Sequence, residues 1–158
     1  NGNLYLTPQY NGENLLLADS GEISHYARAT GGQQLCSKVE NGTVIYRTDN
    51  VVFKQWAGVR RYIGDETAMY GAGTYKLTFK VRADSARTNA LRVKTTLKNN
   101  DRFTYKNISV TKDWTVFEYT FDLTAEQITD PLMIFDINTL DKSVVWFEVC
   151  DLTLVKVR

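Results

Sequence analysis

The chain has few of the residues on which catalysis and covalent cross-linking usually depend. Its 158 residues include one histidine, two cysteines and two prolines. A single histidine, His25, cannot build a site with several histidine ligands, and the sequence has neither a Gly-x-Ser-x-Gly elbow nor a phosphate-binding glycine loop. Asp136 and Glu148 could be imagined as a glycosidase pair, but no signature links these two among 18 acidic residues. The sequence therefore predicts a protein that is not an enzyme.

Two further classes of partner find no support in the composition. The formal net charge is only +1, whereas proteins that bind nucleic acid usually carry a clustered basic excess. No apolar run approaches the roughly 20 residues needed to cross a bilayer. We therefore predict neither a nucleic-acid partner nor a membrane partner.

Two cysteines are too few for a disulfide framework. Cys36 and Cys150 could form one disulfide if their strands are neighbours, and a buried free thiol is an equally good prediction for each. The chain begins at Asn1, with neither a methionine nor a signal peptide. Its length suits one domain, so we expect residues 1–158 to be a single module excised from a larger multimodular protein.

What the sequence does contain is a period-two alternation of apolar and polar residues. Tyr75 to Arg82 is apolar at odd positions, and Trp114 to Asp122 places Phe117, Tyr119 and Phe121 on one side. Because strand side chains alternate between faces, this pattern predicts sheets with one packed face and one face in water. A sandwich of antiparallel sheets with a free face offers a platform for a ligand.

Short strand-like segments separated by turn signals run through the whole chain. The expected strands occupy residues 3–7, 13–18, 22–29, 33–39, 43–49, 51–56, 74–83, 89–98, 102–110, 114–122, 131–138 and 143–157. Asn41-Gly42 predicts a type I′ hairpin, and the only helical prediction is one turn that begins with the capping box from Thr124 to Gln127. The fold class is therefore all-β, a jelly-roll sandwich of two antiparallel sheets.

Aromatic residues outside the apolar phase are candidates for binding a sugar, whose apolar C–H face stacks on an exposed ring. The candidate rings are Trp56, Tyr62, Tyr70, Tyr105 and Trp146. Trp56 lies between Gln55 and Gly58 and favours binding. Trp146 follows two valines and favours the core, whereas the pattern around Tyr105 is compatible with either.

Polar residues in two predicted strands could complete such a site. Arg92 and Lys94 alternate with Leu91 and Val93, a pattern that is typical of a solvated face. Asp136 and Asn138 share a phase with Leu132 and Ile134, so one face of that strand changes from apolar to polar. Such a change suits a ligand cleft, and a strand end leaving the core would produce the same pattern.

The order of these landmarks resembles jelly-roll carbohydrate-binding modules, particularly the xylan-binding family 22 and the related families 4, 9 and 16. Tyr26–Ala29 is similar to the Trp-x-x-Arg-Gly segment of that family, and Gln55–Gly58 is similar to its Trp-x-Gly step. Gly73–Arg82 resembles its Gly-x-x-Tyr-x-x-Ser-x-x-Val-Arg strand. Tyr105 precedes Lys112–Thr115 as a tyrosine precedes the family's Gly-x-Trp segment, and Phe147–Leu154 resembles its closing strand.

The resemblance implies a cleft for a β-1,4-linked glycan, lined by Arg28, Trp56, Tyr105 and Asp136, and Asn138 joins this set through its phase with Asp136. Xylan is the first expected ligand, and β-glucan or xyloglucan is the second. A structural calcium ion is implied between Asp19 and Asp151, although two carboxylates do not make a site for a cation that prefers six or more oxygens.

The predicted protein is a non-catalytic, monomeric module of a secreted, extracellular bacterial enzyme that degrades plant cell walls. It would target an appended glycoside hydrolase to its polysaccharide. A structural or adhesion sandwich that contacts other proteins is the alternative, and a broad apolar patch without a groove would favour it.

Overall fold

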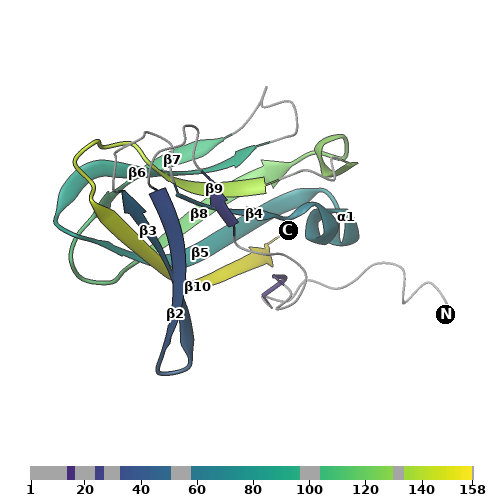
Figure 1. The fold of residues 1–158 in the computed structure, drawn as a ribbon. Coiled ribbons are helices and arrows are strands. Elements are labelled where there is room, and N and C mark those ends of the chain that lie inside the picture. The colour runs from purple at the N-terminus through teal and green to yellow at the C-terminus, as the bar shows by residue number, and fades with distance from the viewer. Residues whose placement is uncertain are drawn as a thin grey trace.

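Two stacked β-sheets make up most of the chain (Figure 1). A computed structural model describes residues 14–16, 24–26, 33–50, 58–96, 104–129 and 134–157. Within these ranges ten strands form two five-stranded sheets, and all the strand pairs are antiparallel. This architecture confirms the predicted all-β sandwich. No described helix is long and apolar enough to cross a membrane.

The first sheet, here sheet A, has the spatial order β1-β4-β9-β6-β7. Its strands are β1 (Ser24–Tyr26), β4 (Gly58–Tyr62), β6 (Arg87–Thr96), β7 (Tyr105–Val110) and β9 (Ile134–Thr139). The central strand β9 pairs with β4 on one side and with β6 on the other. Strands from the first half and the end of the sequence therefore lie next to one another in this sheet.

The second sheet, sheet B, has the order β2-β3-β10-β5-β8. Its strands are β2 (Gln33–Glu40), β3 (Thr43–Asn50), β5 (Gly73–Ala83), β8 (Thr115–Leu123) and β10 (Trp146–Lys156). The predicted Asn41-Gly42 turn joins β2 to β3, and both residues have positive φ, at 50° and 79°. Two positive φ values are what a type I′ hairpin requires.

The core lies between the sheets and follows the predicted alternation. Leu77, Phe79 and Val81 of β5 are completely buried, while Lys76, Thr78 and Lys80 alternate with them toward solvent. The facing side of sheet A supplies the buried residues Val59, Leu91, Val93, Ile108 and Ile137. Because one face of sheet A is used for this core, its opposite face is left for other contacts.

One short helix was not predicted. The helix α1 (Gly64–Tyr70) follows β4 directly, and Gly71 ends it with φ at 84°. Its Glu66 is 3% exposed and accepts a hydrogen bond of 2.5 Å from Arg61 of β4, which is 2% exposed. This buried ion pair joins the helix to the preceding strand β4 across five positions of the chain.

The predicted capping box is present. The backbone N–H of Thr124 donates to Oε1 of Gln127 at 2.9 Å, and the backbone N–H of Gln127 donates to the Thr124 hydroxyl at 3.2 Å. A single 3-10 turn, η2 (Gln127–Thr129), follows. The described helical part of the connector between β8 and β9 is therefore a single turn, as the sequence predicts.

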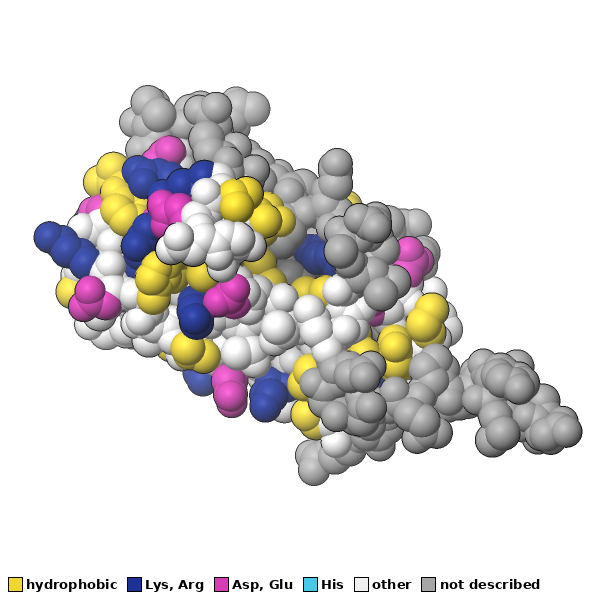
Figure 2. Space-filling model, turned by 90° about the horizontal axis from the view of Figure 1, so that it is seen from below, with side chains coloured by type: hydrophobic (Ala, Val, Ile, Leu, Met, Phe, Trp, Pro, Cys, Tyr) yellow, Lys and Arg dark blue, Asp and Glu magenta, His cyan; other side chains and the backbone are white. Residues whose placement is uncertain are grey.

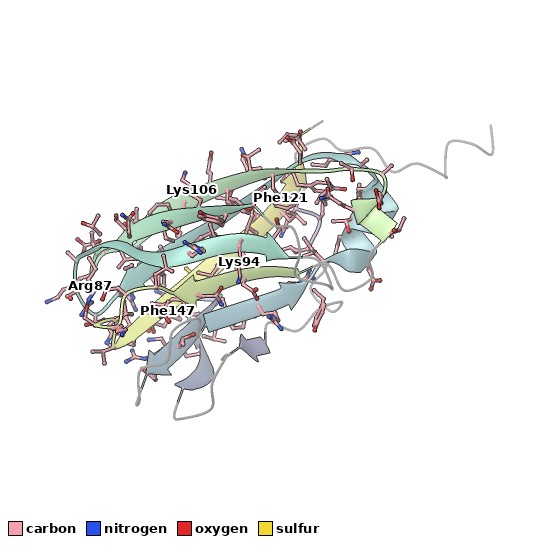
Figure 3. The ribbon with its side chains drawn as sticks, turned by 90° about the horizontal axis from the view of Figure 1, so that it is seen from above. Arg87, Lys94, Lys106, Phe121 and Phe147 are labelled. Atoms are coloured by element: carbon pink, nitrogen blue, oxygen red, sulfur yellow. The ribbon has the colours of Figure 1, made fainter. Side chains whose placement is uncertain are left out.

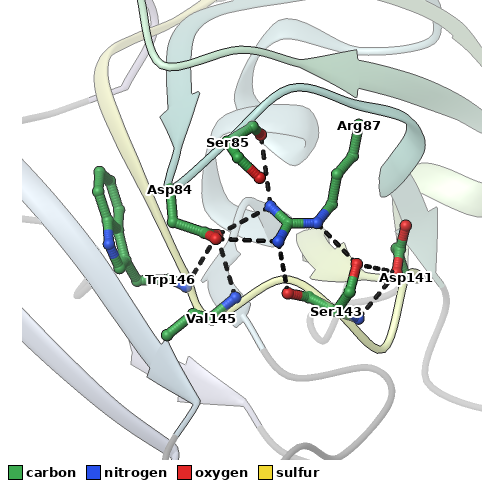
Figure 4. Close-up of polar contacts among 7 residues, drawn as sticks. All are labelled: Asp84, Ser85, Arg87, Asp141, Ser143, Val145 and Trp146. Atoms are coloured by element: carbon green, nitrogen blue, oxygen red, sulfur yellow. Dashed lines mark hydrogen bonds and ion pairs between the residues drawn. The ribbon is translucent and has the colours of Figure 1, made fainter.

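A polar clamp joins two loops at one end of the sandwich (Figure 4). Arg87 donates to both carboxylate oxygens of Asp84, at 3.0 and 2.9 Å, and to the side chain and backbone carbonyl of Ser143, each at 2.7 Å. Asp84 also accepts from the backbone N–H groups of Val145 and Trp146. The β5–β6 turn is thereby tied to the loop that precedes β10.

The two cysteines lie on strands that are not neighbours. Cys36 is in β2 and Cys150 is in β10, and β3 lies between these strands in sheet B. Cys150 is a free, buried thiol. Of the two predicted alternatives, the free thiol is therefore confirmed for Cys150.

Candidate functional site

The outer face of sheet A carries two adjacent rows of residues that cross four strands. The first row places Arg60, Asp136, Lys94 and Tyr105 side by side on β4, β9, β6 and β7, and the second places Gly58, Asn138, Arg92 and Asn107 on the same strands. We call these eight residues the polar platform. Strands lie about 4.8 Å apart, so the platform is about 14 Å wide. Figure 3 shows the molecule from the side of sheet A, with Lys94 of β6 near the middle of the view.

The floor of the platform contains a carboxyl group that is nearly removed from solvent. Asp136 is 1% exposed, and its Oδ1 accepts a hydrogen bond of 2.9 Å from Nε of Arg60. Its Oδ2 has no hydrogen-bond partner among the described residues. Burial raises the pKa of Asp136 above its ordinary value, although Arg60 and Lys94 act in the opposite direction. Asp136 therefore keeps one oxygen that a ligand hydroxyl could use.

Asn138 is the least satisfied residue of this floor. Its side chain is completely buried, yet neither Oδ1 nor Nδ2 has a hydrogen-bond partner among the described residues. Burying an amide without partners costs free energy, and most buried polar groups in proteins are paired. A polar group that stays unpaired on the outer face of a sheet is therefore a candidate for pairing with a ligand.

Gly58 faces Asn138 across the β4–β9 pair. A Cβ atom at this position would lie 1.8 Å from the carbonyl oxygen of Ile137 and 2.9 Å from Cα of Asn138. Only glycine allows the two strands to approach in this way, and the second row of the platform consequently has no side chain on β4.

An aromatic ring and a cation form the β7 side of the platform. Tyr105 is 53% exposed, and the Arg92 guanidinium carbon lies 4.0 Å from the centroid of its ring. Nε of Arg92 donates to Oδ1 of Asn107 at 2.9 Å. The Arg92 guanidinium is thus held by stacking on the Tyr105 ring and by its hydrogen bond to Asn107, and these two contacts orient a planar cation on the sheet surface.

Two exposed tyrosines lie on opposite sides of the buried floor. Tyr62 of β4 is 46% exposed, and Tyr105 of β7 projects on the other side, whereas Asp136 and Asn138 between them are buried. The polar groups are therefore recessed relative to the rings. Rings beside a recessed set of hydrogen-bonding groups suit a ligand with apolar C–H faces and hydroxyl edges.

The structure brings together three of the five predicted glycan-binding residues. Tyr105, Asp136 and Asn138 all lie on the polar platform. Arg28 and Trp56 lie outside the described residues, so their assignment remains a prediction. Arg60, Arg92 and Lys94 were not predicted as site residues. Alternation in β6 indicated that Arg92 and Lys94 face outward, but no strand was predicted at 58–62, so nothing indicated that Arg60 would lie beside Asp136.

The remaining candidate rings have other positions. Tyr70 is the last residue of α1 and packs partly buried against the core. Trp146 is only partly buried and lies under Arg47 of sheet B, with 4.3 Å between the guanidinium carbon and the ring centroid. The core assignment of Trp146 was therefore wrong. Alternation in β10 directs the buried Phe147 inward and its neighbour Trp146 to the outer face.

The described residues do not assemble a calcium site around Asp151. Its carboxylate forms a 3.2 Å ion pair with Nζ of Lys80, so a cation already neutralises it. No group of three or more metal-ligating side chains occurs within the described ranges. Asp19 lies outside these ranges, and the predicted calcium ion stays a prediction.

No protein-family model and no curated protein sequence matches the chain. Solved structures do resemble it. The CBM22-1 xylan-binding domain from Paenibacillus barcinonensis Xyn10C has a TM-score of 0.67 at 12% identity, with 96% of this chain and 99% of that domain covered. A family 4 carbohydrate-binding module gives 0.62 at 20% identity, covering 92% and 90%.

A third structure, the second family 16 carbohydrate-binding module, gives a TM-score of 0.57 at 22% identity, with 79% of this chain and 87% of that module covered. These identities are low, and the likeness is one of fold. The chain has the jelly-roll fold of carbohydrate-binding modules, as its resemblance to families 22, 4 and 16 predicted. A fold hosts many functions, so the function has to be argued from the site.

Proposed function

We propose that this chain is a carbohydrate-binding module and that its ligand lies across the polar platform of sheet A. The observation that carries the proposal is the buried amide of Asn138, two positions from Asp136 on β9. Among the described residues, neither this amide nor Oδ2 of Asp136 has a hydrogen-bond partner. Glycans present hydroxyl groups that both donate and accept, so one hydroxyl can satisfy an amide and a carboxylate together. The fold supports the same proposal, since the similar structures include carbohydrate-binding modules of families 4 and 22.

The rings of Tyr62 and Tyr105 supply the apolar part of the proposed site. Each is about half exposed, and the two rings lie on strands separated by β9 and β6. A pyranose that stacks on one ring would place its hydroxyls over the recessed floor. The platform is about 14 Å wide, which suits a single extended chain better than a crystalline surface.

Within this proposal the ligand is a β-1,4-linked polysaccharide of the plant cell wall, with xylan first and β-glucan or xyloglucan second. The similar family 22 domain is described as xylan-binding, which supports this order. The module would be part of a secreted bacterial protein and would bring an appended glycoside hydrolase to its substrate. It would carry no catalytic residues of its own.

Affinity electrophoresis against a panel of soluble polysaccharides tests the proposal. The wild-type protein should be retarded by at least one β-1,4-glycan, and Asn138→Ala should lose that retardation. Thr120→Ala, an exposed position on the outer face of sheet B, is the matched control and should migrate as the wild type does. Repeating the panel with a calcium chelator tests the predicted calcium ion. Full retardation of Asn138→Ala would refute the site, and no retardation by any glycan would favour the adhesion alternative.

A further inference from the structure

The two outer faces of the sandwich differ in charge. Among the described residues of the polar platform, the three cations Arg60, Arg92 and Lys94 stand against one carboxylate, Asp136, which leaves a net charge of +2. The whole chain carries only +1. The eight residues of the platform therefore carry more positive charge than the chain as a whole, and they lie on the face that we propose for glycan binding.

The described residues on the outer face of sheet B show no such excess of positive charge. Five cations on that face each form an ion pair with a carboxylate: Lys38 with Glu40 and Glu148, Arg47 with Asp49 and Glu148, Lys76 with Glu118, Lys80 with Asp151, and Arg82 with Glu148. Figure 2, seen from the side of sheet B, shows cationic and anionic side chains interspersed over its surface. The described charges on the outer face of sheet B are thus matched by charges of opposite sign, whereas the eight residues of the platform together carry a formal net charge of +2.

The cations of the platform are also placed for recognition. Stacking on Tyr105 and the hydrogen bond to Asn107 fix the plane of the Arg92 guanidinium. A fixed guanidinium binds a carboxylate with less loss of side-chain entropy than a flexible one, and its planar geometry matches that of a carboxylate. Arg92 also covers one face of the Tyr105 ring, so a ligand that approaches there meets a cation together with the aromatic edge.

Lys94 places a second cation in the same area. It lies between Asp136 and Tyr105 in the first row and acts electrostatically on Asp136. Lys94 is adjacent to Arg92 along the outer face of β6, because residues two apart on a strand point to the same side. A single acidic group on a sugar could therefore meet both cations.

We propose that the platform recognises a β-glycan that carries carboxylate groups, that is, a polymer with uronic-acid residues in its backbone or side chains. This inference rests on the proposed function and specifies its ligand class. Arg92 and Lys94 would bind the carboxylate, while Asp136 and Asn138 would bind hydroxyls of the same chain. Arg60, which is paired with Asp136, would hold that carboxyl in place.

Matched pairs of polymers test this proposal. The first pair is a glucuronic-acid-substituted xylan and the same xylan after chemical reduction of its carboxyl groups. The second is a soluble β-1,4-glucan oxidised at C6 and its neutral parent. A sulfated β-glucan of similar charge density separates recognition of a carboxylate from a general preference for anions. Dissociation constants are measured by calorimetry for the wild type, Lys94→Gln and the control Lys80→Gln on sheet B.

The acidic member of at least one pair should bind roughly tenfold more tightly than its neutral partner, the gain expected from one charge-assisted hydrogen bond. Lys94→Gln should remove most of this difference and Lys80→Gln should not. Added salt should reduce the difference in affinity between the acidic and neutral polymers, because salt screens the attraction between charges, with a Debye length of about 8 Å at physiological ionic strength. The sulfated glucan should bind more weakly than the polymers that carry carboxylate groups.

Two negative results have distinct meanings. Equal affinities for acidic and neutral partners would overturn the uronate proposal and leave the glycan-binding proposal intact. Absence of binding to all the polymers would overturn both. A preference for the acidic polymer that persists unchanged in Lys94→Gln, or that the sulfated glucan matches, would overturn the assignment of carboxylate recognition to this face.

Discussion

Replacing Asn138 by alanine should affect stability and binding in opposite directions. The side chain is fully buried and both its polar atoms are without partners among the described residues. An unpaired buried amide costs about 1–3 kcal/mol, and Asn138→Ala removes this cost. The same substitution loses the packing of one carbon, worth about 1 kcal/mol. The free protein should therefore be between unchanged and about 2 kcal/mol more stable.

Thermal and urea unfolding of the ligand-free protein measure this effect. For a domain of this size, the gain corresponds to a rise in Tm of up to about 6 °C. Asn107→Ala is the matched control. It removes the same side chain from an exposed position, and its effect should stay within about 0.5 kcal/mol.

Ligand should reverse the order of stability. A saturating glycan stabilises the folded state in proportion to its affinity, so the wild type should gain Tm on binding and Asn138→Ala should gain much less. The reasoning is refuted if Asn138→Ala loses more than about 1 kcal/mol of stability without ligand. Such a loss would mean that the amide is hydrogen-bonded in the free protein and serves the fold instead of a ligand.

Three further predictions concern stability. Glu66→Ala should lower the free energy of unfolding in urea by about 3–5 kcal/mol, because it removes the carboxylate that lies 2.5 Å from the buried Arg61 guanidinium. Replacing both residues by apolar ones should restore most of this loss, and a loss under about 1 kcal/mol for Glu66→Ala would contradict the buried pair. Gly58→Ala should unfold the protein or lower its Tm, measured by circular dichroism, by more than 10 °C, because the new Cβ would lie 1.8 Å from a carbonyl oxygen of β9. A Tm equal to that of the wild type would show that β4 and β9 can move apart at little cost in free energy. Burial opposes ionisation of Asp84, yet hydrogen bonds from Arg87 and two backbone amides lower its pKa overall. The stability that this carboxylate contributes is therefore present above the unfolded-state pKa near 4, and it is lost as pH falls through the lower folded-state pKa. Asp84→Asn should flatten that acid dependence, and an unchanged profile would refute the clamp.

Local periodicity was sufficient to predict most strands because it depends on neighbouring residues alone. The alternation from Tyr75 to Arg82 correctly separated the core face of β5 from its outer face. The capping box at Thr124 and the turn at Asn41-Gly42 were equally readable, since each is completed within four residues. The helix α1 was missed because it is short and its buried Glu66 pairs with a residue of the preceding strand.

The candidate site was only partly predictable because its residues meet through the order of strands in sheet A. Arg60 and Asp136 are separated by 76 positions and form an ion pair of 2.9 Å. No local pattern shows that β9 lies between β4 and β6. Trp146 was misassigned for a different reason, since the apolar run around it hid the alternation that Phe147 follows.

The sequence by itself determined that this protein is an all-β sandwich with one solvent face on each sheet, because alternation, turn residues and caps act over a few positions. It also nominated Tyr105, Asp136 and Asn138 through phase and family resemblance. Only the tertiary structure decided that these residues share a face with Arg60, Arg92 and Lys94 and that the eight residues of the platform together carry a net charge of +2. The physical reason is that strand register across β4, β9, β6 and β7 depends on packing of the whole core, and charge balance depends on which side chains that register brings together.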